Sequence, residues 1–542
     1  MLKKLHGRKL AVCLIGGAMY ALFSAFGWQA EHGGVIWAGG ALLVAALLVW
    51  PIAALLAVLL ERGYTRALRQ EKTFRAGRAF AFILACYVPM FCVAFPGSFA
   101  YDVPYQLRQV VTGAYSTHHP LLHTLALGGL LQLGRALGDI NLGAALYTAL
   151  QMALLAGCFT LTCGSIARQS GARAAKRAAV FFALYPLNMV MAVNATKDVL
   201  FGGFFALTLA LLNEIQEKPS RGLALKIAAC GALAVMLRNN MAYAALVWLA
   251  LLTIGLRKGE KSAALAMLLA LAVGLCGNAA LKRATRAESG DMSEMLSWPI
   301  QQLARARLYD EDRLTDAEKE AIDELLPDEA WACYDPTISD PVKFEFDTQA
   351  FRADAKKYVG VWLSVGKKCA GTYLDATMAL TYPFFYPYRE YRVSGYYVQM
   401  GMSDAYDAGW CDFDPPESRS LFPRVLASLS WRFGAKGAMQ IPVVGWLFNM
   451  GVIVWTMLFF ALREMYWGRW RRFGTALLPV LLWGTFLLGP VMAGRYIYPF
   501  VCALPVLAAR PGRSVNVNGK VSDTQESQIP AGIRGGYHHE TG

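Results

Sequence analysis

The chain has 542 residues, of which 56% are hydrophobic and only 17% are charged. This composition excludes an ordinary soluble globule and indicates a polytopic membrane protein. Lys and Arg number 52 against 38 Asp and Glu, which gives a net charge of +14. The basic residues lie in short loops between apolar runs, so the excess charge fits the positive-inside pattern of membrane proteins and excludes a nucleic-acid-binding face.

Apolar runs of roughly 20 residues, the length that crosses a bilayer, recur along the chain. They predict an all-α membrane protein of about a dozen transmembrane helices. The expected spans are 10–28, 35–60, 79–95, 142–166, 178–193, 198–215, 222–237, 241–256, 262–281, 440–461, 475–493 and 496–510. We expect the first to be a retained helix, because no small-residue cleavage site stands out after it. The domains expected from this pattern are a transmembrane region 1–281, an outer domain 282–439, C-terminal helices 440–510 and a disordered cytoplasmic tail 511–542.

The loops between these spans predict the orientation, because cytoplasmic loops carry an excess of Lys and Arg. With the N-terminus in the cytoplasm, the basic loops 61–78, 167–177, 213–226, 257–261 and 463–472 all fall inside. This orientation holds only if residues 121–137 do not cross the membrane. We therefore expect that segment to be a helix in the outer membrane interface or a re-entrant helix. The sequence thus predicts a multi-pass protein of the cytoplasmic (inner) membrane with its functional loops outside.

A polar loop, residues 96–141, follows the third expected span and carries Asp102 in an aromatic setting that includes Tyr101. A carboxylate at the mouth of a cavity can act as a general base toward a sugar hydroxyl, or can hold a divalent cation. The alternative is a helix cap, since an Asp shortly before Pro104 is well suited to begin a helix. We place Asp102 in a catalytic role and Tyr101 in substrate binding.

Three histidines, His118, His119 and His123, follow in the same loop. His119 and His123 are four residues apart, a spacing that can bind a metal ion from one face of a helix. No Glu occupies the HExxH position, so a zinc protease is disfavoured. The more usual role of such histidines is hydrogen bonding to phosphate, sugar or backbone, and we expect His118 and His119 to contact substrate.

Lys197 and Asp198 open the span that follows a short outer loop. Placing charged residues at the end of a buried span costs free energy, so such residues are candidates for a functional role. The alternative for Asp198 is a helix cap. Lys197, Arg238 and Arg495 are isolated cations at the outer rim. The planar guanidinium of Arg pairs bidentately with phosphate, so both arginines are candidates for an anionic lipid headgroup, with interfacial snorkelling as the alternative.

The region 282–439 is the one sizeable polar part of the sequence. Thr315 and Glu318 have the spacing of a capping box, which predicts a short helix over 316–326. Aromatic and apolar residues return over 358–388, where we expect a segment lying on the membrane surface. Three cysteines of this region could supply one disulfide: Cys333, Cys369 and Cys411.

Together the motifs HHPLLHTL, TKDVLF, LRNN, MLSWPIQQLAR, YDPTISDPVK and GRYIYPF resemble an uncharacterised family of bacterial polytopic membrane proteins. That family is assigned to the integral-membrane glycosyltransferases of the C-type (GT-C) fold, which use polyprenyl-phosphate-linked sugars. The resemblance implies that Asp102 is the base or a ligand of a divalent cation such as Mg or Mn, and that Asp198 supports it. It also implies that outward arginines bind lipid phosphate. The chain has a lone Asp where the best-known members have DxD or ExD, which leaves the metal requirement open.

The expected activity is transfer of a sugar from a polyprenyl-phosphate donor to a cell-envelope acceptor, a glycan, lipid or protein, at the outer face of the membrane. The sequence contains no P-loop or nucleotide fingerprint, and a lipid-linked sugar is the activated donor that this topology allows. One alternative is a transporter or lipid flippase, which would favour broken helices paired between two inverted halves. Another is an envelope-glycan polymerase or ligase, which uses the same lipid substrates.

Overall fold

The computed structural model describes residues 5, 7–32, 39–62, 73–100, 102–253, 258–290, 292–387, 400–402, 415–433, 441 and 443–510. Over these ranges the protein is all-helical, and strand pairing is limited to isolated β-bridges. Tyr101, Cys411 and the tail after Arg510 lie outside the described residues.

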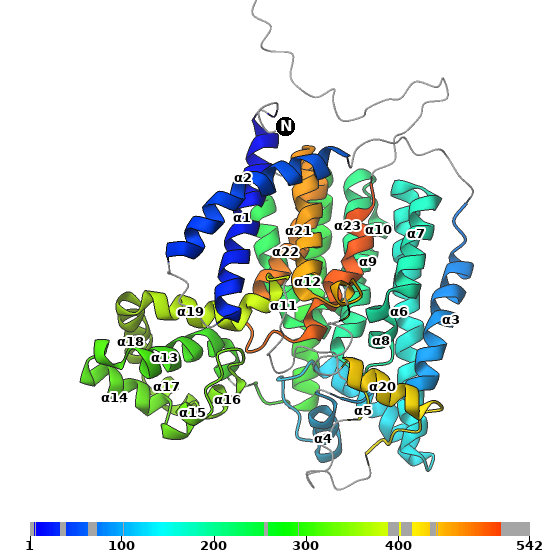
Figure 1. Ribbon diagram of the computed structural model, residues 1–542. Coiled ribbons are helices and arrows are strands. Elements are labelled where there is room, and N and C mark those ends of the chain that lie inside the picture. Colours follow the sequence, from blue (N-terminus) through cyan, green and yellow to red (C-terminus); the bar gives the residue numbers. More distant parts are fainter. Residues whose placement is uncertain are drawn as a thin grey trace, which may run out of the picture.

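Twelve helices of the described residues make up the main bundle, which extends from the N-terminal end at the top of Figure 1 toward the bottom, with α2 lying obliquely at its upper left. They are α1 (Arg8–Glu31), α2 (Gly39–Arg62), α3 (Ala76–Ala94), α6 (Ile140–Ser170), α7 (Ala172–Leu184), α9 (Lys197–Glu217), α10 (Arg221–Leu237), α11 (Asn239–Thr253), α12 (Lys258–Thr285), α21 (Met450–Tyr466), α22 (Trp470–Leu487) and α23 (Tyr498–Ala508). Each overlaps one of the expected spans, although α7 and α21 are displaced from the expected bounds by several residues. Apolar residues of the bundle from α3 onward form one large core, and α1 and α2 pack together in a second cluster with Tyr466 of α21.

Six of these helices are long and apolar enough to cross a membrane. The qualifying segments are Arg8–Glu31, Leu42–Glu61, Ala76–Ala94, Ile140–Ser170, Lys197–Glu217 and Glu260–Thr285. Their presence indicates a membrane protein. The other expected spans are shorter or less apolar helices, and α7 is followed by a separate short helix, α8 (Pro186–Ala192), because Pro186 cannot continue the hydrogen-bond ladder of α7.

Three further helices lie at the lower end of the bundle in Figure 1: α4 (Val103–Thr112), α5 (Leu121–Ala136) and α20 (Pro423–Phe433). Helix α5 occupies the segment that we expected not to cross, and its 16 residues are not among the qualifying spans. It packs closely on α6, because Gly134 and Gly143 face each other without side chains: a Cβ on Gly143 would lie 2.3 Å from the carbonyl oxygen of Leu130.

A group of shorter helices, here named the side domain, sits beside the lower end of α1 in Figure 1. It consists of α13 (Ser297–Tyr309), α14 (Asp316–Leu325), α15 (Asp328–Ala332), α16 (Asp340–Phe344), α17 (Thr348–Ala353), α18 (Ala355–Lys368) and α19 (Ala370–Thr381). It has a hydrophobic core of its own. The expected capping box is confirmed, since Thr315 Oγ1 accepts from the Glu318 amide and Glu318 Oε2 accepts from the Thr315 amide.

The aromatic end of the 358–388 segment departs from the expectation of a surface location. Phe384, Phe385 and Tyr386 are buried in the core of the main bundle, where the Phe385 carbonyl accepts a hydrogen bond from Trp455 of α21. The Phe385 ring lies 4.9 Å from that of Phe23 in α1. The sequence pattern could not distinguish aromatic rings that fill a gap between helices from rings at a headgroup layer.

The cysteines of the side domain do not form the disulfide that we considered, within the described residues. Cys333 and Cys369 are both free, the first exposed and the second buried.

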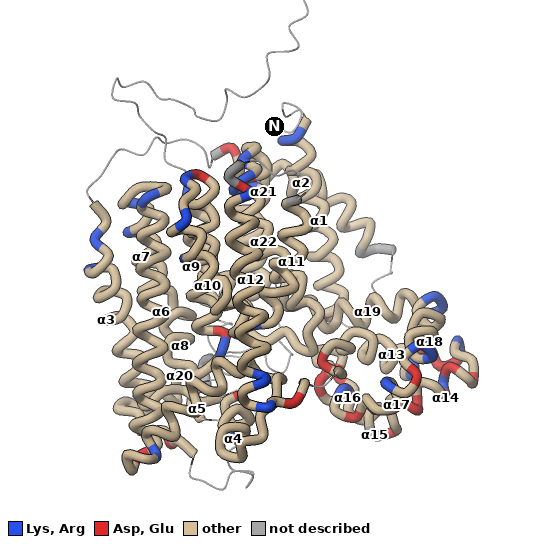
Figure 2. The backbone as a smooth tube through the Cα atoms, turned by 180° about the vertical axis from the view of Figure 1, so that it is seen from behind, with Lys and Arg blue, Asp and Glu red and all other residues tan. Residues whose placement is uncertain are grey.

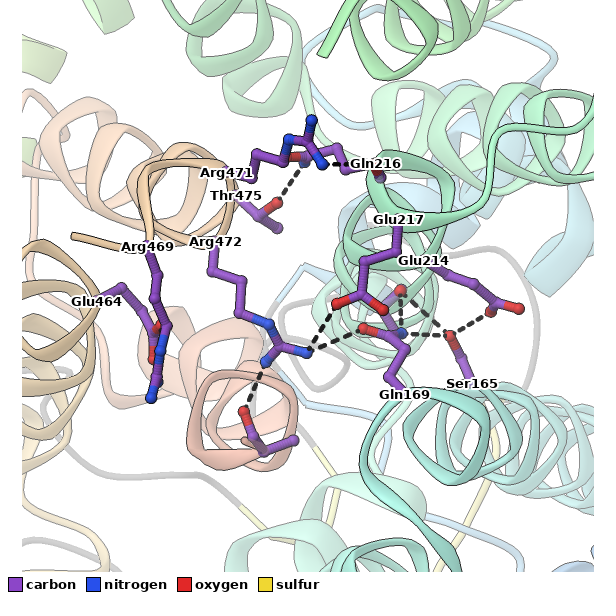
Figure 3. A network of polar contacts seen from close by, with 12 residues as sticks. Ser165, Gln169, Glu214, Gln216, Glu217, Glu464, Arg469, Arg471, Arg472 and Thr475 are labelled. Carbon is purple, nitrogen blue, oxygen red and sulfur yellow. Dashed lines mark hydrogen bonds and ion pairs between the residues drawn. The ribbon is translucent and has the colours of Figure 1, made fainter. Parts of the chain in front are cut away.

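Charge is distributed unevenly between the two ends of the bundle. Figure 2 shows Lys and Arg at the ends of α3, α7, α9 and α21 nearest the N-terminus, whereas Asp and Glu are concentrated on the side domain. At the N-terminal end, Arg472 of α22 donates to Gln169 of α6 (3.3 Å) and to the carbonyl of Ala509 (2.7 Å), and approaches Glu217 of α9 (Figure 3). These contacts connect helices that are distant in sequence and give the terminal nitrogens of this buried arginine acceptors.

Candidate active site

Two loops that are distant in sequence are joined at the lower end of the bundle. The amide of Ser98, after α3, donates to the carbonyl of Val193, and the amide of Ala195 donates to the carbonyl of Ser98, both at 2.8 Å. This pairing holds the start of α4 against the start of α9. Asp102 and Lys197 are thereby brought into direct contact.

Asp102 is surrounded by cations and does not act as a helix cap. It occupies the N-cap position of α4, but its side chain makes no capping hydrogen bond. Its carboxylate instead accepts from Lys197 Nζ through one oxygen and, at 3.0 Å, from Arg495 Nη2 through the other. The Nδ1 atom of His119 lies 3.7 Å from the same carboxylate. The capping alternative for Asp102 is therefore wrong.

Asp198 lies in the first turn of α9 and is fully buried. It forms an ion pair with Arg238, which follows α10, and accepts a hydrogen bond from Thr196 Oγ1 at 3.2 Å. Arg495 Nε is 3.7 Å from Asp198, so this one guanidinium lies between the two carboxylates. The sequence-predicted residues Asp102, Asp198, Lys197, Arg238 and Arg495 thus form one continuous ion-pair network.

The guanidinium of Arg238 lies against two aromatic rings, with its Cζ 4.5 Å from the centroid of Phe486 and 4.4 Å from that of Tyr496. These rings fix the plane of the guanidinium. Its Nε is buried and has no hydrogen-bond partner among the described residues, and the same is true of His119 Nδ1. Buried polar nitrogens are normally satisfied, so the site has hydrogen-bonding capacity for a ligand.

The protonation states follow from these contacts. Burial opposes ionisation of Asp102, but the charges of Arg495 and Lys197 outweigh it and hold the pKa of this carboxyl well below its ordinary value. Burial lowers the pKa of His119 to about 3, against the opposing influence of Asp102, so its imidazole is neutral at pH 7. Among the described residues the network therefore contains three cations and two carboxylates, with a net charge of +1.

His118 and His123 take different positions from His119. His118 is partly exposed and lies 3.9 Å from Glu294 at the edge of the side domain, with its ring against that of His119. His123 is buried, and both of its ring nitrogens are engaged, one with Gln106 (3.1 Å) and the other with the hydroxyl of Tyr147 (2.8 Å). His119 and His123 therefore do not present a joint metal site.

The described residues do not fit a divalent cation. They include no cluster of three or more His, Cys, Asp or Glu side chains that could hold a metal ion. A Mg or Mn ion at Asp102 would also meet Lys197 and Arg495 at close range, where like charges repel by several kcal/mol at an effective dielectric constant of about 20.

The structure adds a connection that the sequence did not reveal. Trp298 of α13 donates from its indole nitrogen to the carbonyl of Leu487 at 2.7 Å. The amide of Ser339 donates to the carbonyl of Pro490 at 2.8 Å, and Ile338 forms a bridge with Val491. The side domain thereby holds the loop that leads to Arg495. Trp298 and Ser339 belong to the motifs MLSWPIQQLAR and YDPTISDPVK, which marked a resemblance in the sequence but indicated no role.

Comparison with known proteins gives a family but no activity. No curated protein and no solved structure shows significant similarity to the chain. A family model matches residues 109–523, a range that includes Asp198, Arg238 and Arg495 and the whole side domain. The chain therefore belongs to DUF6020, a family of unknown function.

Proposed function

We propose that the protein is a membrane glycosyltransferase that transfers a sugar from a polyprenyl-phosphate donor to a cell-envelope acceptor. The observation that carries the proposal is the buried network in which Arg238, Arg495 and Lys197 converge on Asp102 and Asp198. Such a cluster of cations can bind a lipid phosphate, and a carboxylate in contact with them can take a proton from the acceptor.

The proposed location is the cytoplasmic membrane, with about a dozen membrane-crossing helices in a GT-C-like arrangement and the active site facing outward. The distribution of charge supports this orientation, because the bundle ends rich in Lys and Arg lie opposite the site (Figure 2). The short helices α4 and α5 then lie on the outer side, with the side domain beside them (Figure 1). In this proposed orientation the polar site lies at the depth of the lipid headgroups, where the phosphate of a lipid-linked sugar resides.

In the proposed reaction, the acceptor hydroxyl oxygen attacks the anomeric carbon of the donor sugar and forms the new glycosidic bond. The bond from that carbon to the phosphate oxygen breaks, and the polyprenyl phosphate leaves with the electron pair. Asp102 takes the proton of the acceptor hydroxyl. Arg495, Arg238 and Lys197 stabilise the negative charge that develops on the leaving phosphate, the role that oriented cations play in charge-separating transition states.

The test is binding of a short-chain polyprenyl phosphate to the purified protein. Loss of one charge-assisted contact costs about 1.5–3 kcal/mol, so Arg495→Ala and Arg238→Ala should each weaken binding roughly tenfold or more. Arg495→Lys keeps the charge but loses the planar fork, and should lie between the parent and Arg495→Ala.

The matched control is Arg419→Ala, because Arg419 is a half-exposed arginine paired with Asp139 outside the network. Its affinity should equal that of the parent. Undetectable binding by the folded parent would contradict the polyprenyl donor, and a transporter of neutral solutes would then be the better account. Equal affinity for the polyprenyl phosphate across all the arginine variants would show that these arginines do not bind the phosphate.

A further inference from the structure

We propose that the end of the bundle opposite the candidate active site holds a second ligand site, which binds a phosphate group where α21 and α23 end and α22 begins. Its basis is the ion cluster of Figure 3, in which arginines outnumber carboxylates although most of the side chains are buried. No residue of the Asp102 network takes part, so the second site is independent of the proposed glycosyltransferase activity.

The charges of the cluster do not balance. Glu464, at the end of α21, accepts from Arg463 at 2.5 Å and from Arg469 at 3.3 Å. Arg472 lies 3.7 Å from Glu217 at the end of α9. Three arginines of the described chain thus face two carboxylates, and the arginine side chains are at most 15% exposed. Salt screens buried charge poorly, so an excess of positive charge there favours binding of an anion.

A fourth arginine adds to the excess. Arg510 follows α23, and the charges of Arg463 and Arg469 act on it unfavourably and outweigh the attraction of Glu464. The partial charges of the helix ends do not cancel this excess. Three helices end here and one begins, so their half-charges sum to roughly −1, against two uncompensated positive charges.

The start of α22 lacks a negative group of its own. Its N-cap is Arg469, which makes no side-chain capping bond, and its first turn contains no acidic residue. Cations are unfavourable at the positive end of a helix dipole, whereas a phosphate is favoured there by the dipole and by the first amide groups. Arg472 belongs to this first turn, and its Nε is buried without a hydrogen-bond partner among the described residues. Phosphate oxygens are the kind of acceptor that these groups lack.

Anchoring of α23 explains only part of the cluster. Arg463 donates to the carbonyls of Leu507 (2.7 Å) and Ala508 (3.3 Å), and Arg472 donates to that of Ala509 (2.7 Å), so both arginines cap the end of α23. These contacts leave the excess charge and the buried Nε unexplained. The positive-inside pattern does not explain them either, because arginines that merely follow that pattern extend into water.

The position of the cluster favours a lipid headgroup as the source of the phosphate. Trp470, the first residue of α22, is 43% exposed, and the guanidinium carbon of Arg8 lies 5.9 Å from its ring. Exposed tryptophans of membrane proteins gather at the headgroup layer, and basic pockets between helix ends bind anionic phospholipids there. The expected ligand is therefore an anionic phospholipid of that leaflet. A soluble phosphate is the other source of the same chemistry.

The experiment measures the binding of three probes to the purified full-length protein in a non-ionic detergent. The probes are short-chain phosphatidylglycerol, short-chain phosphatidylcholine and inorganic phosphate. The parent should bind phosphatidylglycerol more tightly than phosphatidylcholine, whose choline cation offsets the phosphate charge. Arg472→Gln and Arg469→Gln should each weaken phosphatidylglycerol binding by about tenfold, the effect of one charge-assisted contact. Arg472→Lys keeps the charge but loses the planar fork, and should lie between the parent and Arg472→Gln.

Two controls separate this site from other causes. Arg221→Gln removes one positive charge from an exposed arginine at the start of α10, at the same end of the bundle, and should bind phosphatidylglycerol as the parent does. Arg495→Ala alters the candidate active site and should also keep the parental affinity for phosphatidylglycerol. If Arg472→Gln does not fold, Arg469→Gln provides the test, because the Arg469 side chain is the more exposed of the two.

Binding of phosphatidylglycerol without binding of inorganic phosphate would identify a lipid headgroup as the ligand. Inorganic phosphate that binds and is weakened by the same arginine variants would identify a soluble phosphate. The second site is overturned if Arg472→Gln and Arg221→Gln lose the same affinity, or if only Arg495→Ala loses it. A parent that binds the two lipids equally and does not bind inorganic phosphate would overturn it as well, and would leave the proposed glycosyltransferase untouched.

Discussion

At the scale of single residues, the buried histidines predict a dependence of stability on pH. Burial lowers the pKa of both His119 and His123 from 6.5 to about 3, so the folded protein keeps them neutral at pH values where the unfolded chain protonates them. Unfolded chains then bind more protons, and the free energy of unfolding should fall as the pH drops from 6.5 toward 3. At pH 5.5 each histidine should account for about 1.4 kcal/mol.

The measurement is the melting temperature of purified protein at pH 7.5 and at pH 5.5. The melting temperature of His123→Gln should change less between the two pH values than that of the parent. His118→Gln, which alters a partly exposed neighbour, should keep the parental shift. An unchanged pH shift in His123→Gln would show that His123 does not titrate as the structure indicates.

Asp102 shows which part of the site the sequence could predict. It precedes a proline-started helix and looks like a cap, but its side chain makes no capping bond and lies between two cations instead. The predicted topology put both Asp102 and Asp198 at the outer face of the membrane. It could not predict that Arg495 lies between them, because that depends on the packing of helices nearly 300 residues apart.

At the scale of elements, the positions of helices were largely predictable from apolar runs, and the positions of loops from basic residues, because both depend on local composition. The contacts between helices were not predictable in this way. The burial of Tyr386 and its neighbours in the main bundle, and the contact of the side domain with the loop before Arg495, depend on which surfaces meet. A single sequence carries no signal for such pairings.

The close contact of α5 with α6 gives a prediction about stability. Gly143→Ala would place a Cβ 2.3 Å from the backbone oxygen of Leu130, so the two helices must move apart, at a cost of about 1–3 kcal/mol. Gly129→Ala in α5 has open space around its Cβ and should be neutral or stabilising by up to about 1 kcal/mol. Melting temperatures of the two variants test this, and equal values would contradict the packing of α5 on α6.

The contact between the side domain and the loop before Arg495 gives a prediction about binding. Trp298→Phe keeps an aromatic ring but removes the donor to the Leu487 carbonyl, which should loosen the loop and weaken polyprenyl-phosphate binding by roughly two- to tenfold. Trp362→Phe removes a comparable indole hydrogen bond, to Gln302, within the side domain, and should bind as the parent does. Equal affinities for the two variants would show that the loop is held without Trp298.

At the scale of the whole molecule, the two ends of the bundle should lie on opposite sides of the membrane. Lys176 in α7 and Glu320 in α14 are both exposed and belong to opposite ends. In a variant without its eleven cysteines, Glu320→Cys should react with an impermeant maleimide added to intact cells. Lys176→Cys should react only after the membrane is permeabilised. The reverse pattern would invert the orientation and place the candidate site in the cytoplasm.

In the proposed reaction the network around Asp102 transfers sugar from a polyprenyl phosphate. The most direct test of this reaction is release of labelled polyprenyl phosphate from lipid-linked sugars extracted from bacterial membranes, with purified parent and with Asp102→Asn. The parent should release polyprenyl phosphate in the presence of envelope acceptors, and Asp102→Asn should do so about 10²–10⁴-fold more slowly while still binding the lipid. Release by Asp102→Asn at the parental rate, or no release by a parent that binds the lipid, would contradict the account.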